Sequence, residues 1–409
     1  MNIRFLKNEK FKSNSISLSI PIELDERVTD LNLMCAIMKS GSKKYDSFKK
    51  LYSKLQELYG AYFNCHLNKC GEVVILTFYM EFLKDKYINE KLFLWNEIIN
   101  FMHEIFYNVL SENNAFTEDI FNIEKENLRR YILSMSDSKD YYAYLKCEQM
   151  STLNEPYSHY IFGSEERLSK IDSNSLYKFY TDLRNCPFYF IVTGDFNENE
   201  IEELIKDKFG NNIYKKFSTN NNKFIKTDFI ENYERHDVTQ TKLVINFKTP
   251  ITIFNGDFYN FFVFNTILGG GYSKLYREVR QKRNLVYSIN SRYEYFKGLL
   301  TIDCGIDDKN FQLTKDIIFE EINNISKGEI SQDDIENAKK SIRREISSIE
   351  DRISSIHGFT ISPYIYDIDI KTSDFIENIN KVTKEKVVLA SKEIIKSAIF
   401  SVRPLKEGN

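Results

Sequence analysis

The sequence has no long hydrophobic run. Its longest apolar stretches, such as Val73–Leu76 and Phe261–Phe264, are far shorter than the roughly 20 residues that a membrane-spanning helix needs. The first residues, MNIRFLKNEKFKSNS, also lack the continuous apolar segment of a secretory signal. These absences argue against a membrane protein and against secretion. We therefore expect a soluble protein, with the cytoplasm as its location.

The sequence also lacks a basic block. Its 56 lysines and arginines are spread along the chain among 59 acidic residues, and the net charge is −3. A nucleic-acid-binding protein usually concentrates positive charge on one stripe or face. The charge pattern therefore predicts no nucleic-acid partner.

The sequence lacks the pattern of a disulfide framework, because its cysteines lie inside apolar segments of a large chain. The chain contains Cys35, Cys65, Cys70, Cys147, Cys186 and Cys304. In a chain of this size such positions favour reduced, buried thiols. Cys65, His66 and Cys70 invite interpretation as a metal site. In a strand, however, side chains alternate, so positions 65 and 70 point to opposite faces.

The length and the order of elements predict two domains. A chain of 409 residues exceeds the roughly 250–300 residues that one hydrophobic core supports. Residues 209–230 form an Asn-rich, polar linker between domains at 1–208 and 231–409. Both halves show the order helix, strand pair, helices, and Ile171 has a counterpart about half a chain later in Val382. We expect an α+β fold of two homologous domains, each an antiparallel-rich sheet with helices packed on one face.

The first strand has a regular alternation. Ile16, Leu18, Ile20 and Ile22 stand among serines and a proline. Such a pattern is typical of a strand with one buried face. It predicts a strand pair near an edge of its sheet.

The clearest chemical pattern lies in the second half. Gly269-Gly270-Gly271 precedes a capped helix from Lys274 to about Lys282, and a strand that contains Tyr287 follows. Arg280 and Tyr287 are seven residues apart, so they could converge on one ligand at the end of the helix. A forked guanidinium and a phenol hydroxyl suit a peptide carbonyl or carboxylate. The alternative is a solvated basic helix followed by a core tyrosine.

Two nucleotide-binding interpretations of these glycines fail. A phosphate loop needs Gly-Lys-Ser/Thr at a fixed gap after its first glycine, whereas here Gly271 is followed by Tyr272-Ser273-Lys274. The dinucleotide pattern G-x-G-x-x-G is absent, and the segment before the glycines is helical in pattern. The glycines therefore predict a turn and no phosphate site.

The run LGGGYSKLYREVRQKRNLVYSINSRYEYFKGLLTIDCGID resembles the C-terminal half of M16 (pitrilysin/insulinase-like) peptidases. The segments LQELYGAYFN and FYFIVTGDF extend the likeness over essentially the whole chain, to the YmfF-like branch that lacks the zinc motif. In the family an arginine at the helix end and a tyrosine seven residues later bind substrate. The resemblance assigns these roles to Arg280 and Tyr287.

Active members of the family carry His-x-x-Glu-His on the first long helix, with a further glutamate on a later helix. By this resemblance the motif falls on Asn32, Cys35 and Ala36, and the distal glutamate on Tyr131. Zinc hydrolases need imidazole and carboxylate ligands and a base for the bound water. The remaining histidines are scattered, at His66, His103, His159, His236 and His357. We therefore expect no metal, no cofactor and no catalytic residue in this chain alone.

The resemblance implies a division of labour between two chains. This chain would be an inactive M16 subunit in a heterodimer with a zinc-bearing homologue, and the partner would hold the zinc. Arg280 would anchor a peptide or protein substrate and Tyr287 would stabilise the developing oxyanion. The alternatives are a non-catalytic scaffold or peptide-binding subunit of a larger assembly, and a stand-alone zinc peptidase with atypical ligands.

Overall fold

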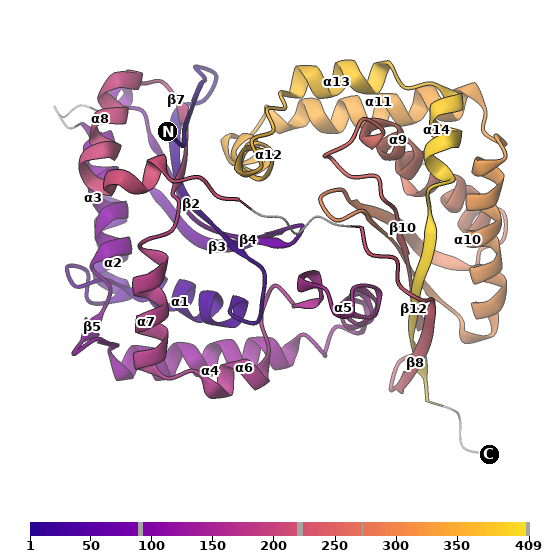
Figure 1. The fold of residues 1–409 in the computed structure, drawn as a ribbon, viewed down its shortest axis with the longest axis horizontal. Helices are drawn as coiled ribbons and strands as arrows, with labels where there is room; N and C mark the ends of the chain where they lie inside the picture. The colour runs from indigo at the N-terminus through magenta and orange to yellow at the C-terminus, as the bar shows by residue number, and fades with distance from the viewer. Residues whose placement is uncertain (89–92, 219–223, 272, 406–409) are drawn as a thin grey trace. The chain divides into compact units, whose positions relative to one another are not determined.

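A computed structural model describes residues 1–88, 93–218, 224–271 and 273–405 (Figure 1). The chain forms two compact units. Unit 1 contains Met1–Leu133, His159–Thr219 and Glu350–Asp369, and unit 2 contains Ser134–Ser158, Asn220–Ile349 and Ile370–Asn409. The predicted boundaries follow the chain in order, whereas these units exchange two helical segments. Residues 219–223 of the predicted linker lie outside the described residues.

The sheet of unit 1 has five strands, and the first and last in the following order are its edge strands. In spatial order they are β1 (Ile3–Lys7), β7 (Tyr189–Gly194), β2 (Ser13–Glu23), β4 (Val73–Leu83) and β3 (Tyr62–Cys70). The pair β1–β7 is parallel and the other pairs are antiparallel. The helices of this unit are α1 (Val28–Ser40), α2 (Phe48–Glu57), α3 (Leu94–Tyr107), α4 (Glu118–Ser134), α6 (Glu165–Lys170), α7 (Ser173–Leu183), α8 (Glu198–Phe209) and α12 (Ile353–Ile365). A small hairpin joins β5 (Ser111–Glu112) to β6 (Ala115–Phe116).

Unit 2 repeats this plan. Its strands, in spatial order, are β8 (Ile230–His236), β12 (Ile395–Pro404), β9 (Thr241–Lys248), β11 (Leu299–Ile306) and β10 (Val286–Glu294). Its helices are α5 (Lys139–Ser151), α9 (Phe258–Gly269), α10 (Phe311–Ser326), α11 (Gln332–Ile349), α13 (Thr372–Asn380) and α14 (Lys384–Ser391), with a helical segment η4 (Tyr276–Gln281). Here β8–β12 is the parallel pair, as β1–β7 is in unit 1. The matching order places β3 and β10 at corresponding edges and confirms the predicted α+β fold class.

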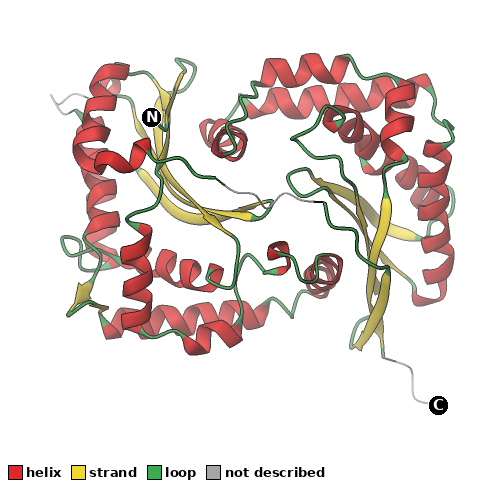
Figure 2. Ribbon diagram, viewed as in Figure 1, coloured by secondary structure: helices red, strands yellow, loops and turns green. Residues whose placement is uncertain are grey.

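The core of unit 1 lies on one face of its sheet. Ile16, Leu18 and Ile20 of β2 are fully buried there among side chains of α1, α3 and α7. Burial of such side chains supplies most of the favourable free energy of folding. The sheets and the helices beside them are distinguished by colour in Figure 2.

The other face of this sheet is also covered. Ser15, Ser17 and Ser19 of β2 are buried, and α12 packs against β2 and β7. Tyr79, which pairs with Ser17 in the sheet, contacts His357 of α12. β2 is therefore a central strand, and the expectation that it lies near an edge was wrong. Its serines face a helix, and small side chains allow that helix to approach closely.

The sheet of unit 2 likewise receives a helix from the preceding half of the sequence. Ala143 and Cys147 of α5 form a buried cluster with Val244 of β9 and Phe400 of β12. The Cys147 thiol lies 3.5 Å from the carbonyl oxygen of Val244. This packing holds α5 to the sheet of unit 2.

A buried ion cluster fixes the segment after α5 in the same unit. The Glu155 carboxylate, whose side chain is 1% exposed, pairs with Lys248 of β9 and, at 2.6 Å, with Lys297. A buried carboxylate requires such partners because desolvation disfavours an isolated charge.

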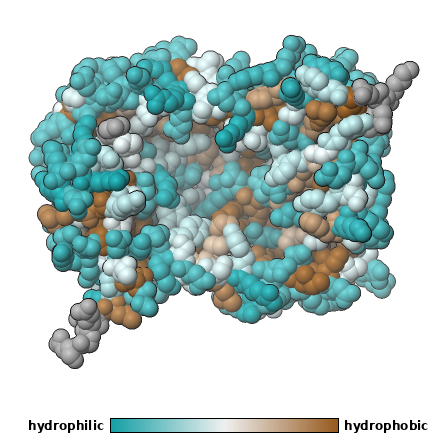
Figure 3. Space-filling model, turned by 180° about the vertical axis from the view of Figure 1, so that it is seen from behind, coloured by the Kyte–Doolittle hydropathy of each residue, from teal (hydrophilic) through white to brown (hydrophobic). Residues whose placement is uncertain are grey.

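The face of the molecule that Figure 3 shows is mostly polar. On the face shown in Figure 3, hydrophilic residues cover much of the molecule and hydrophobic residues occur in separate patches. Within the described residues, every helix is too short or too polar to cross a bilayer.

Candidate functional site

The predicted degenerate motif positions lie around one pocket of unit 1. Helix α1 packs along the edge strand β3 and carries Asn32, Cys35 and Ala36. These three residues line a pocket of about 450 Å³, together with Tyr131 of α4. The structure thus brings together four residues that the sequence spreads over a quarter of the chain.

Each of these four side chains has a structural environment unlike that of a zinc ligand. The Asn32 amide donates to the carbonyl oxygens of Val28 and Ile161, both at 2.8 Å. Tyr131 packs edge-on against Phe162, with 5.3 Å between ring centroids. A committed amide, a thiol, a methyl group and a phenol do not make the set of imidazole and carboxylate donors that zinc requires.

The charged residues of the pocket do not supply the missing ligands. The carboxylate of Glu124 accepts hydrogen bonds from Ser40 Oγ at 2.6 Å and from the Asn127 amide at 3.3 Å. Lys39 adds a positive charge to the same lining, which disfavours a cation. Within the ranges that the structure describes, no cluster of three or more His, Cys, Asp or Glu is arranged to hold a metal ion. The residues present do not fit zinc.

Two histidines that are far apart in the sequence lie close together in unit 1. His66 of β3 borders the pocket, and His357 of α12 is buried against Tyr79, with 5.3 Å between ring centroids. Burial, and to a smaller extent the nearby His66, lowers the pKa of His357 to about 3. His66 Nδ1 and His357 Nε2 are buried and have no hydrogen-bond partner among the described residues. No spacing in the sequence indicates this pair, because tertiary packing alone joins β3 to α12.

The remaining histidines lie elsewhere. His103 packs against Tyr107, and His236 Nε2 lies 2.9 Å from the Glu234 carboxylate. The carbonyl oxygen of His159 accepts a hydrogen bond from Lys69. Among the described residues, none of these three histidines lines the pocket beside α1.

Arg280 lies on a local irregularity in unit 2. The sequence predicts an α-helix from Lys274 to about Lys282, but η4 is a π-helix over Tyr276–Gln281. The Lys282 amide donates to the Arg277 carbonyl five residues earlier, at 2.9 Å. Such wide turns are rare and are frequent at functional sites. The wider turn ends at Asn284, which has a positive φ of 50°.

Tyr287 lies in a bulge at the start of the edge strand β10. Val286 pairs with Ile306, and Ile289 pairs with Cys304, so two residues of β10 oppose a single residue of β11. A bulge of this kind redirects a side chain. Tyr287 is consequently 80% exposed. The alternative of a core tyrosine does not describe this position.

The guanidinium group of Arg280 lies over the aromatic ring of Tyr287. The Arg280 guanidinium carbon lies 5.3 Å from the ring centroid of Tyr287 and equally far from that of Tyr276. Over the residues described, Arg280 makes no ion pair with a carboxylate. By contrast, its neighbour Arg277 pairs with Asp334 at 2.7 Å, and Lys282 and Arg283 pair with Glu278. The N–H groups of Arg280 are therefore not neutralised by an acid.

The chain resembles known proteins over its full length. Residues 170–342 match the model of the peptidase M16 inactive domain. The probable inactive metalloprotease YmfF of Bacillus subtilis (strain 168) is 30% identical over 96% of this chain and 93% of its own. The uncharacterized zinc protease YmxG of the same strain is 24% identical over 67% of this chain and 68% of its own. The crystal structure of a conserved protein from Enterococcus faecalis V583 has a TM-score of 0.90 and 26% identity, and covers 100% of this chain and 97% of its own.

Proposed function

The chain belongs to the M16 peptidase family as an inactive member, and we propose that it forms a heterodimer with a zinc-bearing M16 homologue. In this pair the partner holds zinc and activates water. This chain binds the peptide and stabilises the oxyanion that develops during hydrolysis. The observation that carries the proposal is the un-neutralised Arg280 beside the exposed Tyr287 hydroxyl.

The chemistry of the two groups suits these roles. Arg280 offers a planar fork of N–H donors to a peptide carbonyl or carboxylate. The Tyr287 hydroxyl can donate one hydrogen bond, and its side chain is exposed at the start of β10. A donor aimed at the position of the developing negative charge accelerates hydrolysis because its bond strengthens in the transition state.

The edges of the two sheets supply a second kind of contact. β3 and β10 are edge strands, so one side of each has backbone groups that are not paired within the sheet. An extended peptide can add to such an edge as a further strand. The edge strand β10 carries Tyr287, so a peptide on that edge would pass the hydroxyl group.

The names of the relatives support the pairing. The bacterium that contains the probable inactive relative also contains a zinc protease relative. Hydrolysis by a pair of this type needs one set of zinc ligands, which the pocket of this chain lacks. We place the pair in the cytoplasm, in line with the sequence expectation.

Co-expression with a zinc-bearing M16 homologue from the same organism tests the proposal. We expect the two chains to co-elute in size-exclusion chromatography at equal stoichiometry. The mixture should cleave a library of fluorogenic peptides that neither chain cleaves alone. Separate elution at micromolar concentration would overturn the pairing. Co-elution with a partner that is equally active alone would favour the scaffold function instead.

A further inference from the structure

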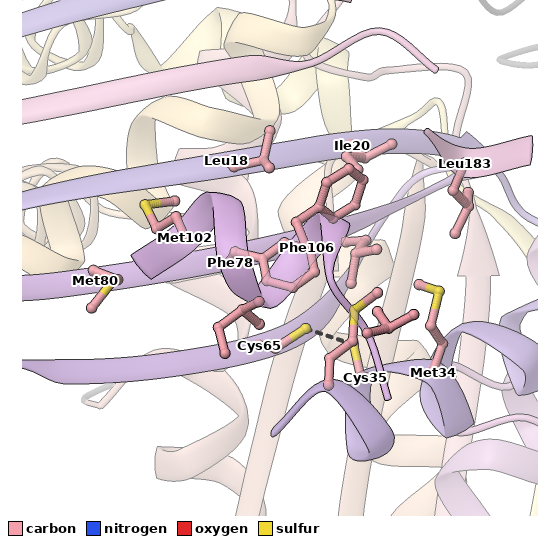
Figure 4. Close-up of a cluster of buried hydrophobic side chains, with 14 of the residues drawn as sticks. Leu18, Ile20, Met34, Cys35, Cys65, Phe78, Met80, Met102, Phe106 and Leu183 are labelled. Carbon is pink, nitrogen blue, oxygen red and sulfur yellow. Dashed lines mark hydrogen bonds between the residues drawn. The ribbon is translucent and has the colours of Figure 1, made fainter. Parts of the chain in front are cut away.

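Two cysteines face each other at the wall of the pocket in unit 1. Cys35 of α1 and Cys65 of β3 have their Sγ atoms 3.0 Å apart (Figure 4). Cys35 is 5% exposed and Cys65 is 1% exposed. Both line the pocket of about 450 Å³ that contains the degenerate motif positions. The pair therefore borders a space that a small molecule can enter.

The arrangement is close to that of a covalent bond. A disulfide has its sulfurs about 2 Å apart, so these two atoms need to approach by only about 1 Å. They belong to a helix and a strand that pack directly against each other.

The other cysteines of unit 1 lack this geometry. Cys70, at the end of the same strand, is buried outside the cluster that contains Cys65. Cys186 is partly exposed, and its Sγ lies 3.9 Å from the carbonyl oxygen of Asp182. The contact of two thiol groups is specific to Cys35 and Cys65 among the described cysteines.

We propose that Cys35 and Cys65 are a modification site that forms a reversible disulfide with a small disulfide, such as oxidised glutathione, as the reactant. The Cys35 thiol, which is the more exposed, loses its proton and attacks one sulfur of the reactant. The reactant's S–S bond breaks, and one glutathione leaves as a thiolate that takes up a proton.

The second step closes the bond within the protein. Cys65 loses its proton and attacks Sγ of Cys35, which releases the second glutathione as a thiol. The protein loses two electrons and two protons, and the reactant is reduced to two thiols. The new bond ties α1 to the edge strand β3. This inference does not depend on the proposed zinc-bearing partner.

Thiol mapping of the full chain tests the site. The protein is equilibrated in buffers of increasing ratio of oxidised to reduced glutathione, quenched with acid, unfolded and alkylated. We expect an oxidised form in which four of the six cysteines are alkylated, with a cross-linked peptide that joins Cys35 to Cys65. After reduction with dithiothreitol, we expect all six cysteines to be alkylated.

Matched variants sharpen the result. Cys35→Ser and Cys65→Ser should each abolish the cross-linked peptide, whereas Cys70→Ser should retain it. Alkylation of all six cysteines at every ratio would overturn the proposal, as would a stable glutathione adduct on Cys35 or a cross-link to another cysteine. Thiol mapping of the chain without substitutions tests the Cys35–Cys65 disulfide even where a variant fails to fold.

Discussion

The Arg280 guanidinium lies over the ring of Tyr287, at 5.3 Å from its centroid, and no carboxylate within the described residues neutralises it. Cation–π contact of this kind holds the charge in place and leaves its N–H groups free to bind a ligand. Two local irregularities produce the arrangement. The π-helical turn positions Arg280, and the bulge in β10 turns Tyr287 outward.

Removal of the Tyr287 hydroxyl should lower the peptidase activity of the proposed heterodimer. Tyr287→Phe keeps the ring beneath Arg280, so we expect kcat of the heterodimer to fall by about 100-fold through loss of one oxyanion donor. Arg280→Ala should mainly raise KM. Tyr233, an exposed tyrosine of β8 with Arg403 at 4.9 Å from its ring, gives the control variant Tyr233→Phe. Unchanged steady-state kinetics in both site variants would remove this role.

Glu155 should be critical for the stability of unit 2. Glu155→Gln removes the carboxylate charge that pairs with Lys248 and Lys297, whose side chains are at most 6% exposed. We expect the free energy of unfolding to fall by about 3–5 kcal/mol, measured by urea titration. Glu166→Gln, which breaks an exposed pair with Lys170, is the control and should leave the urea midpoint unchanged. Equal effects of the two substitutions would contradict the buried ion cluster.

Unit 1 should lose stability in mild acid because of His357. Burial lowers its pKa from 6.5 to about 3 in the folded chain. Between these values the unfolded chain binds more protons, so stability is complete above pH 6.5 and falls as the pH drops toward 3. At pH 5 the expected loss is about 2 kcal/mol. His357→Phe should weaken this pH dependence of unfolding, whereas His236→Gln should preserve it. If the free energy of unfolding changes equally with pH in the unsubstituted chain and in both variants, His357 is not the cause.

The pocket around α1 should accept a restored zinc motif. The combined substitutions Asn32→His, Cys35→Glu, Ala36→His and Tyr131→Glu place imidazoles and carboxylates on residues that line one pocket. We expect one zinc ion per chain after dialysis, measured by atomic absorption. Asn32→His alone should retain none. A folded quadruple variant without zinc would show that these positions do not correspond to the motif.

The sequence predicted the fold class because local patterns determine it. The alternation of Ile16, Leu18 and Ile20 identified β2, and the helical spacing of Leu31, Met34 and Met38 identified α1. The exchange of α5 and α12 between the units was not predictable in this way. Ser15, Ser17 and Ser19 form a pattern like that of a solvated face, although they are buried in a strand against which a helix distant in sequence packs.

For the candidate site, too, the sequence indicated the residues but not the local geometry that positions them. The resemblance located Arg280 and Tyr287, but periodicity gave no sign of the π-helical turn or of the bulge that exposes Tyr287. The contact of Cys35 with Cys65 depends on the register of a helix against a strand. Such contacts between elements leave no periodic signal in one sequence, so only the structure reveals them.

The metal content and activity of the isolated chain test the central claim most directly. The protein is purified without its partner, dialysed against metal-free buffer, analysed for zinc and incubated with a peptide library, with and without a chelator. The account predicts substoichiometric zinc and no chelator-sensitive cleavage, because the pocket at Asn32, Cys35 and Ala36 lacks zinc donors. One retained zinc per chain, together with cleavage that the chelator abolishes, would contradict it.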